Sequence, residues 1–522
     1  MGYTRHLSRR EIAQMIPLLS SGALLVPLRG EQRNTQTPGV IRGKLVDDAT
    51  GQPVAAKMRV TDVFSGEALF PDHAIKTMPK NAEPGARCYF YARGSYEIAV
   101  PPGRYRIEVV RGICHDQVVQ QAEVGAGIAH VHDFRVPVLR DLRAAGWYCG
   151  NTHTHYHLQI DEDPDERLRT VPPAEALDVS AISYLIRGDS PYITNRYPIG
   201  RLPQFSRDGT LIDMGQECRN NLVSDGIGYG HCLFLNIPHL VQPVSTGALA
   251  FQKDAPDFPT LSMICAEAKR VGGTTIWCHN GAGMEAPVAA ALGNVDAYNV
   301  ADGGEADYNR YYNLLNCGFR LPASTGTDWW IYDHNRVFVR VEGDFTYDSW
   351  LSGLRAGRTF VSNGPLIELL VNGQGPGASI EGSGEPLQVR ASVISRLPFD
   401  RLEIVQDGRL VAEQTAMRNR TARLESELPA ERSGWVAARV RSSAKTHGGY
   451  TVFAHTSPVY VRVAGTASRR GEAAGAFVDE LEASMRFIRK SYSFASDADR
   501  ATAIGRFEQT RQFYLKLLAS GA

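Results

Sequence analysis

The sequence predicts a multidomain protein in which a central α/β domain is flanked by all-β domains and followed by a pair of helices. Residues 39–138 and 366–465 alternate apolar and polar positions, as half-buried β-strands do. Residues 144–365 instead alternate short apolar strands with longer helical stretches, and residues 466–522 favour helix. At 522 residues the chain is longer than one ordinary domain of about 100–200 residues, so we expect several folded units.

The balance of charge excludes two classes of partner. The 56 Lys and Arg residues equal the 56 Asp and Glu residues, which leaves no basic excess to neutralise a nucleic-acid backbone or to bind an anionic membrane. Hydrophobic residues make up 43% and charged residues 21%, as in ordinary globular proteins. We therefore expect a small-molecule partner, no nucleic acid and no global disorder.

Residues 1–30 resemble a twin-arginine export signal. The motif Ser-Arg-Arg-Glu-Ile at residues 8–12 precedes an apolar stretch over residues 15–28, which contains two prolines. The stretch is shorter than the roughly 20 residues that span a bilayer. The resemblance implies a periplasmic or otherwise exported protein, and leaves open whether the segment is cleaved or stays as an N-terminal anchor. An amphipathic first helix is the alternative, and we expect no other integral membrane segment.

Residues 39–138 predict a β-sandwich. Their turns, Thr-Gly-Gln-Pro at residues 50–53 and Pro-Pro-Gly-Arg-Tyr at residues 101–105, resemble those of the carboxypeptidase-regulatory-like β-sandwich. Such modules are structural spacers. We therefore expect no catalytic group here, His130 and His132 in the last strand included.

Residues 366–465 predict a second β-sandwich, because β patterning returns there. Within residues 466–522, two helix-forming stretches at 473–491 and 499–518 predict a helical hairpin that packs on a neighbouring domain.

The strongest chemical signal is a run of alternate histidines, His153, His155 and His157. On an extended strand these three side chains share one face. This arrangement suits imidazoles that surround a metal ion, whereas three polar rings on one face are unfavourable in an apolar core. A hydrogen-bonded core cluster is the alternative.

Further motifs follow in order: Gly-Gln-Glu at residues 215–217, Gly-His at 230–231, Trp-Cys-His-Asn at 277–280 and Gly-Thr-Asp at 326–328. Together with Gly-Trp-Tyr-x-Gly before the first His-x-His, this order resembles the PHP (polymerase and histidinol phosphatase) superfamily, particularly its carbaryl-hydrolase-like CehA/McbA family. The resemblance implies a distorted (β/α)7 PHP-type barrel over residues 144–365.

The resemblance also implies a centre of two divalent ions, Zn, Mn or Fe. Its six ligands would be His153, His155 and Asp328 on the first ion, Glu217 as the bridge, and His231 and His279 on the second. Carboxylates can bridge cations, and neutral imidazoles suit these metals. Each assignment has an alternative. Glu217 could be a surface carboxylate, His231 and His279 could be ordinary core histidines, and Asp328 could be a turn residue.

The sequence departs from the fullest PHP pattern at two places. Residues 187–190 read Arg-Gly-Asp-Ser and residues 328–330 read Asp-Trp-Trp, where many members have histidines that serve a third metal. Two metals are therefore expected, with Trp330 as an apolar wall that favours an uncharged aromatic or acyl substrate. Asp161 and Asp163 are either ligands or exposed loop carboxylates.

The resemblance also implies hydrolysis by a metal-activated water, with an ester, amide or carbamate as substrate. His157 is the candidate catalytic residue, as general acid or substrate-positioning group, and a ligand role is its alternative. Arg336 and Arg358 either stabilise an oxyanion or form structural salt bridges. A PHP-type phosphoesterase and, as a non-enzyme, an exported surface- or carbohydrate-binding protein with an inactive barrel are the competing functions. The oligomeric state stays open.

The eight cysteines lack the Cys-x-x-Cys spacing of structural zinc sites; they are Cys88, Cys114, Cys149, Cys218, Cys232, Cys265, Cys278 and Cys317. Cys218, Cys232 and Cys278 each adjoin a predicted ligand. Because neighbouring side chains on a strand point to opposite faces, we expect these three to point away from the metals as small buried apolar groups.

Overall fold

The computed structural model describes residues 37–77, 87–156, 163–188, 192–206, 209–221, 227–248, 255–302, 305–328, 335–382, 384–466 and 470–520. All described residues but Thr37 belong to one compact unit, Pro38–Ala522. The export-signal prediction for residues 1–30 lies outside the described residues.

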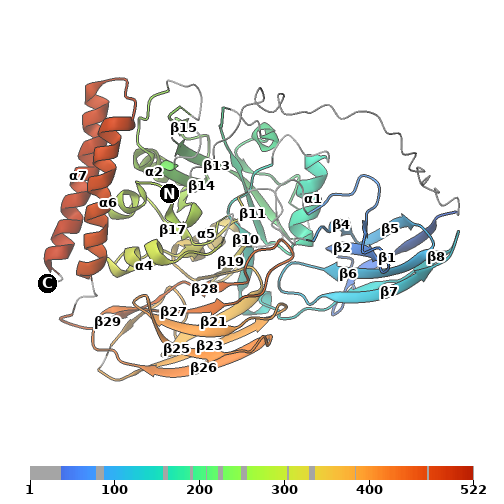
Figure 1. Cartoon of the computed structure of the whole chain (residues 1–522). Helices are drawn as coiled ribbons and strands as arrows, with labels where there is room; N and C mark the ends of the chain where they lie inside the picture. Colours follow the sequence, from blue (N-terminus) through green and yellow to red (C-terminus); the bar gives the residue numbers. More distant parts are fainter. Residues whose placement is uncertain are drawn as a thin grey trace, which may run out of the picture. The chain divides into compact units, whose positions relative to one another are not determined.

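The first sheet has nine strands, in the order β7-β6-β2-β4-β5-β1-β8 with β3 on β2 and β9 on β1 (Figure 1). Its strands are β1 (Gly39–Asp47), β2 (Ala55–Asp62), β3 (Ala68–Leu69), β4 (Phe90–Arg93), β5 (Ser95–Val100), β6 (Gly103–Val110), β7 (Val118–Val124), β8 (Ala129–Val131) and β9 (Phe134–Val136). Alternate residues of β5 are buried, as its sequence pattern indicates. Ile41, Met58 and Ile107 are fully buried in the core that this sheet encloses.

The central part is a large curled sheet. Its strands up to residue 362 are β10 (Trp147–Asn151), β11 (Val179–Tyr184), β12 (Gly200–Arg201), β13 (Leu211–Asn221), β14 (Ile227–Leu235), β15 (Ser245–Thr246), β16 (Thr274–Trp277), β17 (Ala297–Asn299), β18 (Ala323–Ser324), β19 (Arg336–Arg340) and β20 (Thr359–Ser362). Strand β19 pairs back onto β10, with Trp147 opposite Arg340, so the sheet curls round. The helices between the strands are α1 (Pro164–Ala174), α2 (Leu261–Arg270), α3 (Ala286–Ala291), α4 (Asn309–Asn316) and α5 (Tyr347–Arg355).

The pairing in this sheet is mixed. Strands β10, β11 and β13 are parallel, but β14 is antiparallel to both β13 and β16, and β16, β17 and β18 are again parallel. The expected α/β character is therefore present, whereas the structure does not show a regular (β/α)7 barrel. The antiparallel β13–β14 pair takes the place of one strand–helix–strand crossover.

A glycine of the first strand explains how α5 covers the sheet. A Cβ on Gly150 would lie 2.3 Å from Cζ2 of Trp350, so only glycine lets this fully buried ring reach β10. The Trp350 indole N–H donates to the carbonyl of Tyr148 at 3.2 Å.

Residues 365–462 add two facing layers. The strands are β21 (Pro365–Val371), β22 (Ser379–Glu381), β23 (Leu387–Ser395), β24 (Arg401–Gln406), β25 (Arg409–Thr415), β26 (Thr421–Leu428), β27 (Gly434–Arg441), β28 (Ala454–Thr456) and β29 (Val459–Arg462). Strands β21, β23 and β26 form a separate sheet, whereas β28 pairs with β20, so the other strands continue the curled sheet. The predicted boundary at residue 365 thus falls between two layers that share one hydrophobic core.

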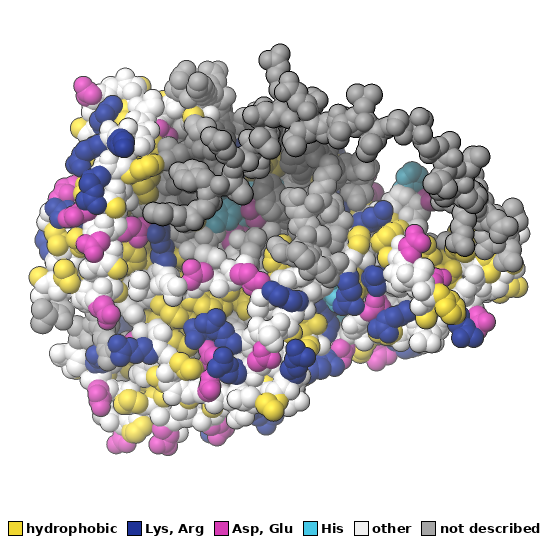
Figure 2. Space-filling model, viewed as in Figure 1, with side chains coloured by type: hydrophobic (Ala, Val, Ile, Leu, Met, Phe, Trp, Pro, Cys, Tyr) yellow, Lys and Arg dark blue, Asp and Glu magenta, His cyan; other side chains and the backbone are white. Residues whose placement is uncertain are grey.

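The C-terminal helical pair is present as predicted: α6 spans Arg470–Ser491 and α7 spans Asp497–Ser520 (Figure 1). The ring of Tyr492 stacks on Tyr229 with centroids 4.7 Å apart, and the Tyr514 hydroxyl donates to the carbonyl of Pro287 at 2.9 Å. Within the described helices, none is both long and apolar enough to cross a membrane. Basic and acidic side chains are interspersed over the face shown in Figure 2, in keeping with the balanced composition.

A buried ionic cluster joins the first sheet to the curled sheet. Glu175, just after α1, lies 2.8 Å from Lys57 Nζ on β2 and 3.1 Å from an Arg336 nitrogen on β19, and all three side chains are at most 1% exposed. The Tyr91 hydroxyl donates to the same carboxylate at 2.9 Å. Arg336 is therefore a structural ion-pair residue, which supports the salt-bridge interpretation over an oxyanion role.

Acid should weaken the fold through His455. Its Nδ1 donates to the carbonyl of Thr456 at 2.6 Å, its Nε2 accepts from the Tyr312 hydroxyl at 2.7 Å, and burial together with Arg439 lowers its pKa to about 3. Because the unfolded imidazole takes up a proton near its ordinary pKa of 6.5, this stability is complete above that pH and falls as the pH drops toward 3.

The expected loss is on the order of 1 kcal/mol per pH unit below about 6.5. Urea unfolding at neutral pH and at about one unit below 6.5 should show a shallower pH dependence for His455→Gln than for the unaltered protein. The exposed His239→Gln serves as the control. Equal slopes for all three proteins would contradict the assignment.

Candidate metal centre

Backbone hydrogen bonds hold the segment after β10 against residues 325–328, which follow β18. The amide of His155 donates to the Asp328 carbonyl at 2.8 Å, and the amide of Asp328 donates to the His153 carbonyl at 3.0 Å. Asn151 accepts at Oδ1 from the amides of His153 and Thr327. These bonds place two histidines and Asp328, from distant parts of the chain, side by side.

Gly326 makes this close approach possible. A Cβ at that position would lie 2.6 Å from the backbone nitrogen of His153, so a larger residue would push the two segments apart. Asp328 itself has a φ of 60°, a left-handed conformation that Asp tolerates better than most residues and that costs some conformational energy. The Gly-Thr-Asp motif is therefore explained by geometry.

The first cluster comprises His153, His155, Glu217 and Asp328, whose ligand atoms lie within 4.8 Å of one another. The two Nε2 atoms of His153 and His155 are 3.0 Å apart. Glu217 Oε2 is 2.8 Å from His155 Nε2, and Asp328 Oδ1 is 3.3 Å from His153 Nε2. Two nitrogens and two carboxylate oxygens thus converge on one point.

The second cluster uses the other oxygen of Glu217. On the antiparallel pair β13–β14, His231 lies opposite Arg219 and diagonally across from Glu217, so these side chains share one face. His231 Nδ1 is 2.9 Å from Glu217 Oε1, and His279 Nε2 is 3.8 Å from the same oxygen. Glu217 therefore faces one cluster with each carboxylate oxygen, as a bridging ligand must.

All six residues predicted as ligands are thus brought together. Sequence reasoning missed a further residue of the centre, Asp302. Its Oδ2 is 2.7 Å from His153 Nδ1 and 3.6 Å from His279 Nδ1. Asp302 lies three residues after the end of β17. Its position just after a short apolar strand is a sequence signal that could have identified it. The contact leaves His153 Nε2 pointing at the first cluster, which is how carboxylates orient metal-binding histidines.

The buried charges of the centre favour a cation. Burial raises the pKa of Glu217, but Arg219 and the hydrogen bond from His153 more than offset it and hold the pKa well below its usual range. Burial likewise opposes ionisation of Asp302, yet His153 keeps the pKa of Asp302 low. Asp328 adds a third carboxylate, and Glu217, Asp302 and Asp328 are residues at most 9% exposed, so their charge has to be offset by Arg219, by a protonated histidine or by a bound cation.

The pKa values of His153 and His231 are shifted in opposite directions. Burial lowers the pKa of His153, but Asp302 and Asp328 raise it well above its ordinary value. Burial and Arg219 lower the pKa of His231 to about 3, which keeps that ring neutral and able to coordinate a metal.

Arg219 and Tyr192 also lie beside the centre, and the sequence analysis named neither. Arg219 is 9% exposed and acts on both Glu217 and His231, and the Tyr192 ring meets His155 edge to face with centroids 5.5 Å apart. Arg219 stands two residues after Glu217 on β13, so alternation on the strand could have identified it.

For Cys278 the predicted direction was wrong, although the residue is fully buried in the hydrophobic core as expected. Its Sγ belongs to a group with His153, His279 and Asp302 whose ligand atoms lie within 4.8 Å of one another. The reason is that β16 ends at Trp277, so the strand alternation used for the prediction no longer applies at Cys278. Cys218 and Cys232 are fully buried in the hydrophobic core, as expected.

Other predicted residues fall elsewhere. Asp163 is the N-cap of α1 and accepts from the amide of Asp165 at 2.9 Å, so it is a helix-capping carboxylate and not a ligand. Arg358 pairs with Glu342 at 3.5 Å, a structural salt bridge. Four further residues lie outside the described residues, namely His157, Asp161, Ser190 and Trp330.

Replacing Asp302 by Asn should weaken metal binding about 10- to 100-fold, because the carboxylate that orients His153 loses its charge. A chelator-competition titration would measure this, with the exposed Asp344→Asn as control. Unchanged affinity would show that His153 needs no such partner.

No family model matches the chain, and no curated protein does. Among solved structures, a distant neighbour is a two-domain protein with a predicted PHP-like metal-dependent phosphoesterase from Bacteroides vulgatus ATCC 8482; the match has 14% identity, covers 60% of this chain and 94% of that one, and has a TM-score of 0.31. A glycosyl hydrolase family 2 member from Bacteroides cellulosilyticus DSM 14838 matches at 11% identity, over 79% of this chain and 59% of that one, with a TM-score of 0.18. At these low TM-scores, function has to be argued from the geometry of the centre.

Proposed function

We propose that this protein is a metal-dependent hydrolase with two divalent ions in this centre. The observation that supports it is the approach of His153 Nε2 and His155 Nε2 to 3.0 Å. The Nδ1 atoms of these rings already have acceptors, the Asp302 carboxylate at 2.7 Å and the Ser183 carbonyl at 3.1 Å. In the neutral tautomers that donate from Nδ1, both Nε2 atoms would present lone pairs to each other and to two carboxylates, an arrangement suited to a cation between them.

The donor set fits two ions of the zinc, manganese or iron type. Imidazole nitrogens and carboxylate oxygens are suitable ligands for these metals, and Glu217 offers one oxygen to each cluster. When bound, such ions lower the pKa of a coordinated water toward neutrality and so supply hydroxide for hydrolysis. Asp302 would hold His153 in the tautomer that coordinates through Nε2.

For the bond that is cleaved, we propose an ester, amide or carbamate. The support is the resemblance of the motifs from residue 146 to 365 to the CehA/McbA family, in which the curled sheet would be a distorted PHP-type barrel. In the same proposal His157 protonates the leaving group or positions the substrate, and the twin-arginine-like residues 1–30 direct the protein to the periplasm.

A phosphoester is the second candidate, and Arg219 favours it. This guanidinium lies close enough to the centre to lower the pKa of Glu217 and His231. A cation beside two metals suits an anionic phosphoryl group, to which Arg can bind through two hydrogen bonds.

A substrate panel on metal-loaded full-length protein separates these functions. The first candidate requires turnover of p-nitrophenyl acetate or an aryl N-methylcarbamate above that of p-nitrophenyl phosphate, and Arg219→Gln should then change that turnover little. The second requires the opposite preference, with a loss of about 10-fold or more in kcat/KM for Arg219→Gln. Two bound metals without turnover of any of the three would favour the non-enzyme alternative.

A further inference from the structure

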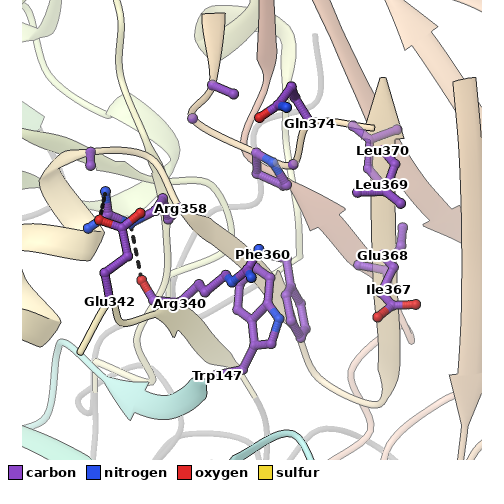
Figure 3. Close-up of a pocket in the computed structure, with 15 residues that line it drawn as sticks. Trp147, Arg340, Glu342, Arg358, Phe360, Ile367, Glu368, Leu369, Leu370 and Gln374 are labelled. Atoms are coloured by element: carbon purple, nitrogen blue, oxygen red, sulfur yellow. Dashed lines mark hydrogen bonds and ion pairs between the residues drawn. The ribbon is translucent and has the colours of Figure 1, made fainter. Parts of the chain in front are cut away.

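A cavity of about 370 Å³ lies between the curled sheet and strand β21 (Figure 3). Its walls come from the start of β10, the end of β19, the turn between α5 and β20, and the loop between β21 and β22. None of its lining residues is a candidate metal ligand. Trp147 in this cavity precedes His153 by six residues, which corresponds to roughly 20 Å of extended strand.

The inside of the cavity is apolar and aromatic. Trp147 and Phe360 meet edge to face with ring centroids 5.1 Å apart, and Figure 3 shows Ile367 and Leu369 on the strand opposite. Phe360, Ile367 and Leu369 are at most 2% exposed, whereas Trp147 is partly exposed. A partly exposed indole beside buried apolar side chains offers a surface on which a flat ring can pack.

Among the charged side chains that line the cavity, Arg340 has no ionic partner in the described part of the chain. Arg358 pairs with Glu342 at 3.5 Å, and Glu368 pairs with Arg140. Arg340, which is exposed, forms no side-chain hydrogen bond or ion pair with the described residues. Figure 3 shows its side chain running toward Phe360 and Trp147, so its guanidinium lies at the aromatic end of the cavity.

The loop between β21 and β22, which forms another wall of the cavity, is held in one conformation by backbone contacts. The amide of Gly377 donates to the Pro458 carbonyl at 2.8 Å, and a Cβ on Gly377 would lie 2.3 Å from the Ala356 carbonyl oxygen. Its φ of 85° also favours glycine. The loop between β21 and β22 is therefore fastened against the turn before β20, and little ordering is needed when a ligand enters.

We propose that this cavity binds a small aromatic carboxylate. The ring would pack on Trp147 and against Leu369, where it displaces water from apolar surface, and the carboxylate would pair with Arg340. This site goes beyond the proposed hydrolase function, because it uses no residue of the metal centre.

Isothermal titration with 2-naphthoate tests the proposal on the full-length protein. We expect Arg340→Gln to weaken binding about 10-fold or more, since a charge-assisted hydrogen bond is lost. Trp147→Leu should weaken it by a similar factor. As control, Arg390→Gln alters an exposed pair with Glu425 on β23 and β26 and should leave binding unchanged.

Two further measurements separate this cavity from the metal centre. 2-Naphthamide, which keeps the ring and lacks the charge, should bind the unaltered protein about 10-fold more weakly, and this comparison requires no folded variant. Glu217→Gln should still bind 2-naphthoate. Binding that survives Arg340→Gln but is lost in Glu217→Gln would place the ligand at the metals and overturn the proposal, as would equal binding of amide and carboxylate.

Discussion

Replacing Glu217 by Gln should remove both the metal pair and the hydrolytic activity. One carboxylate oxygen lies 2.8 Å from His155 Nε2 and the other 2.9 Å from His231 Nδ1, so a single side chain serves both clusters. The amide keeps the shape but loses the charge and one of the two acceptor oxygens. We expect metal content to fall below two ions per chain and kcat/KM to fall about 10³-fold or more, equivalent to roughly 4 kcal/mol.

Elemental analysis of the purified variant, together with turnover of its best substrate, measures both effects. Glu97→Gln is the matched control, because its carboxylate is 66% exposed in a surface pair with Arg42. If Glu217→Gln kept two ions and full activity, the bridging assignment would be wrong. If it lost activity but kept two ions, the carboxylate would act on the reaction and not as a bridge.

Replacing Glu175 by Gln should destabilise the fold by about 3–5 kcal/mol. The change removes the carboxylate that pairs with both Lys57 and Arg336, so two cations whose side chains are at most 1% exposed each lose a buried ion pair. The substitution should weaken the contact between the first sheet and the curled sheet, because Lys57 belongs to β2 and Arg336 to β19.

Urea unfolding monitored by circular dichroism measures this change. Glu97→Gln is again the control and should alter the free energy of unfolding by less than about 1 kcal/mol, since exposed pairs contribute little. Removing all three charges with Lys57→Met, Glu175→Leu and Arg336→Met should restore much of the loss. Equal stability of Glu175→Gln and Glu97→Gln would show that the buried pairs are compensated by water.

Many of the strands and helices could be predicted because they depend on the local pattern of apolar, polar and helix-forming residues. Alternation along β5 and the helix-forming residues of α6 and α7 appear in the structure where the sequence placed them. The regular barrel could not be derived in this way. Strand β14 runs antiparallel to both neighbours, and the direction of a strand depends on the path of its connections, which residue periodicity does not encode.

For the centre, the two-residue spacing of His153 and His155 predicts side chains on one face of an extended segment. In the structure β10 ends at Asn151, and backbone hydrogen bonds to Asp328 hold the segment that carries these two histidines. The order of the motifs indicates the chemical type of the donors. These inferences need only the geometry of one short segment.

Which of these groups meet depends on the fold of the whole chain. Glu217 reaches His155 across 62 residues, and Asp302 reaches His153 across 149, so both contacts depend on how the sheet curls. The same holds for Cys278, which turns toward the cluster because β16 has already ended. Local periodicity determines the face of a strand, but contacts between distant strands follow from the packing of the whole sheet, and this is why Asp302 was missed and Cys278 misplaced.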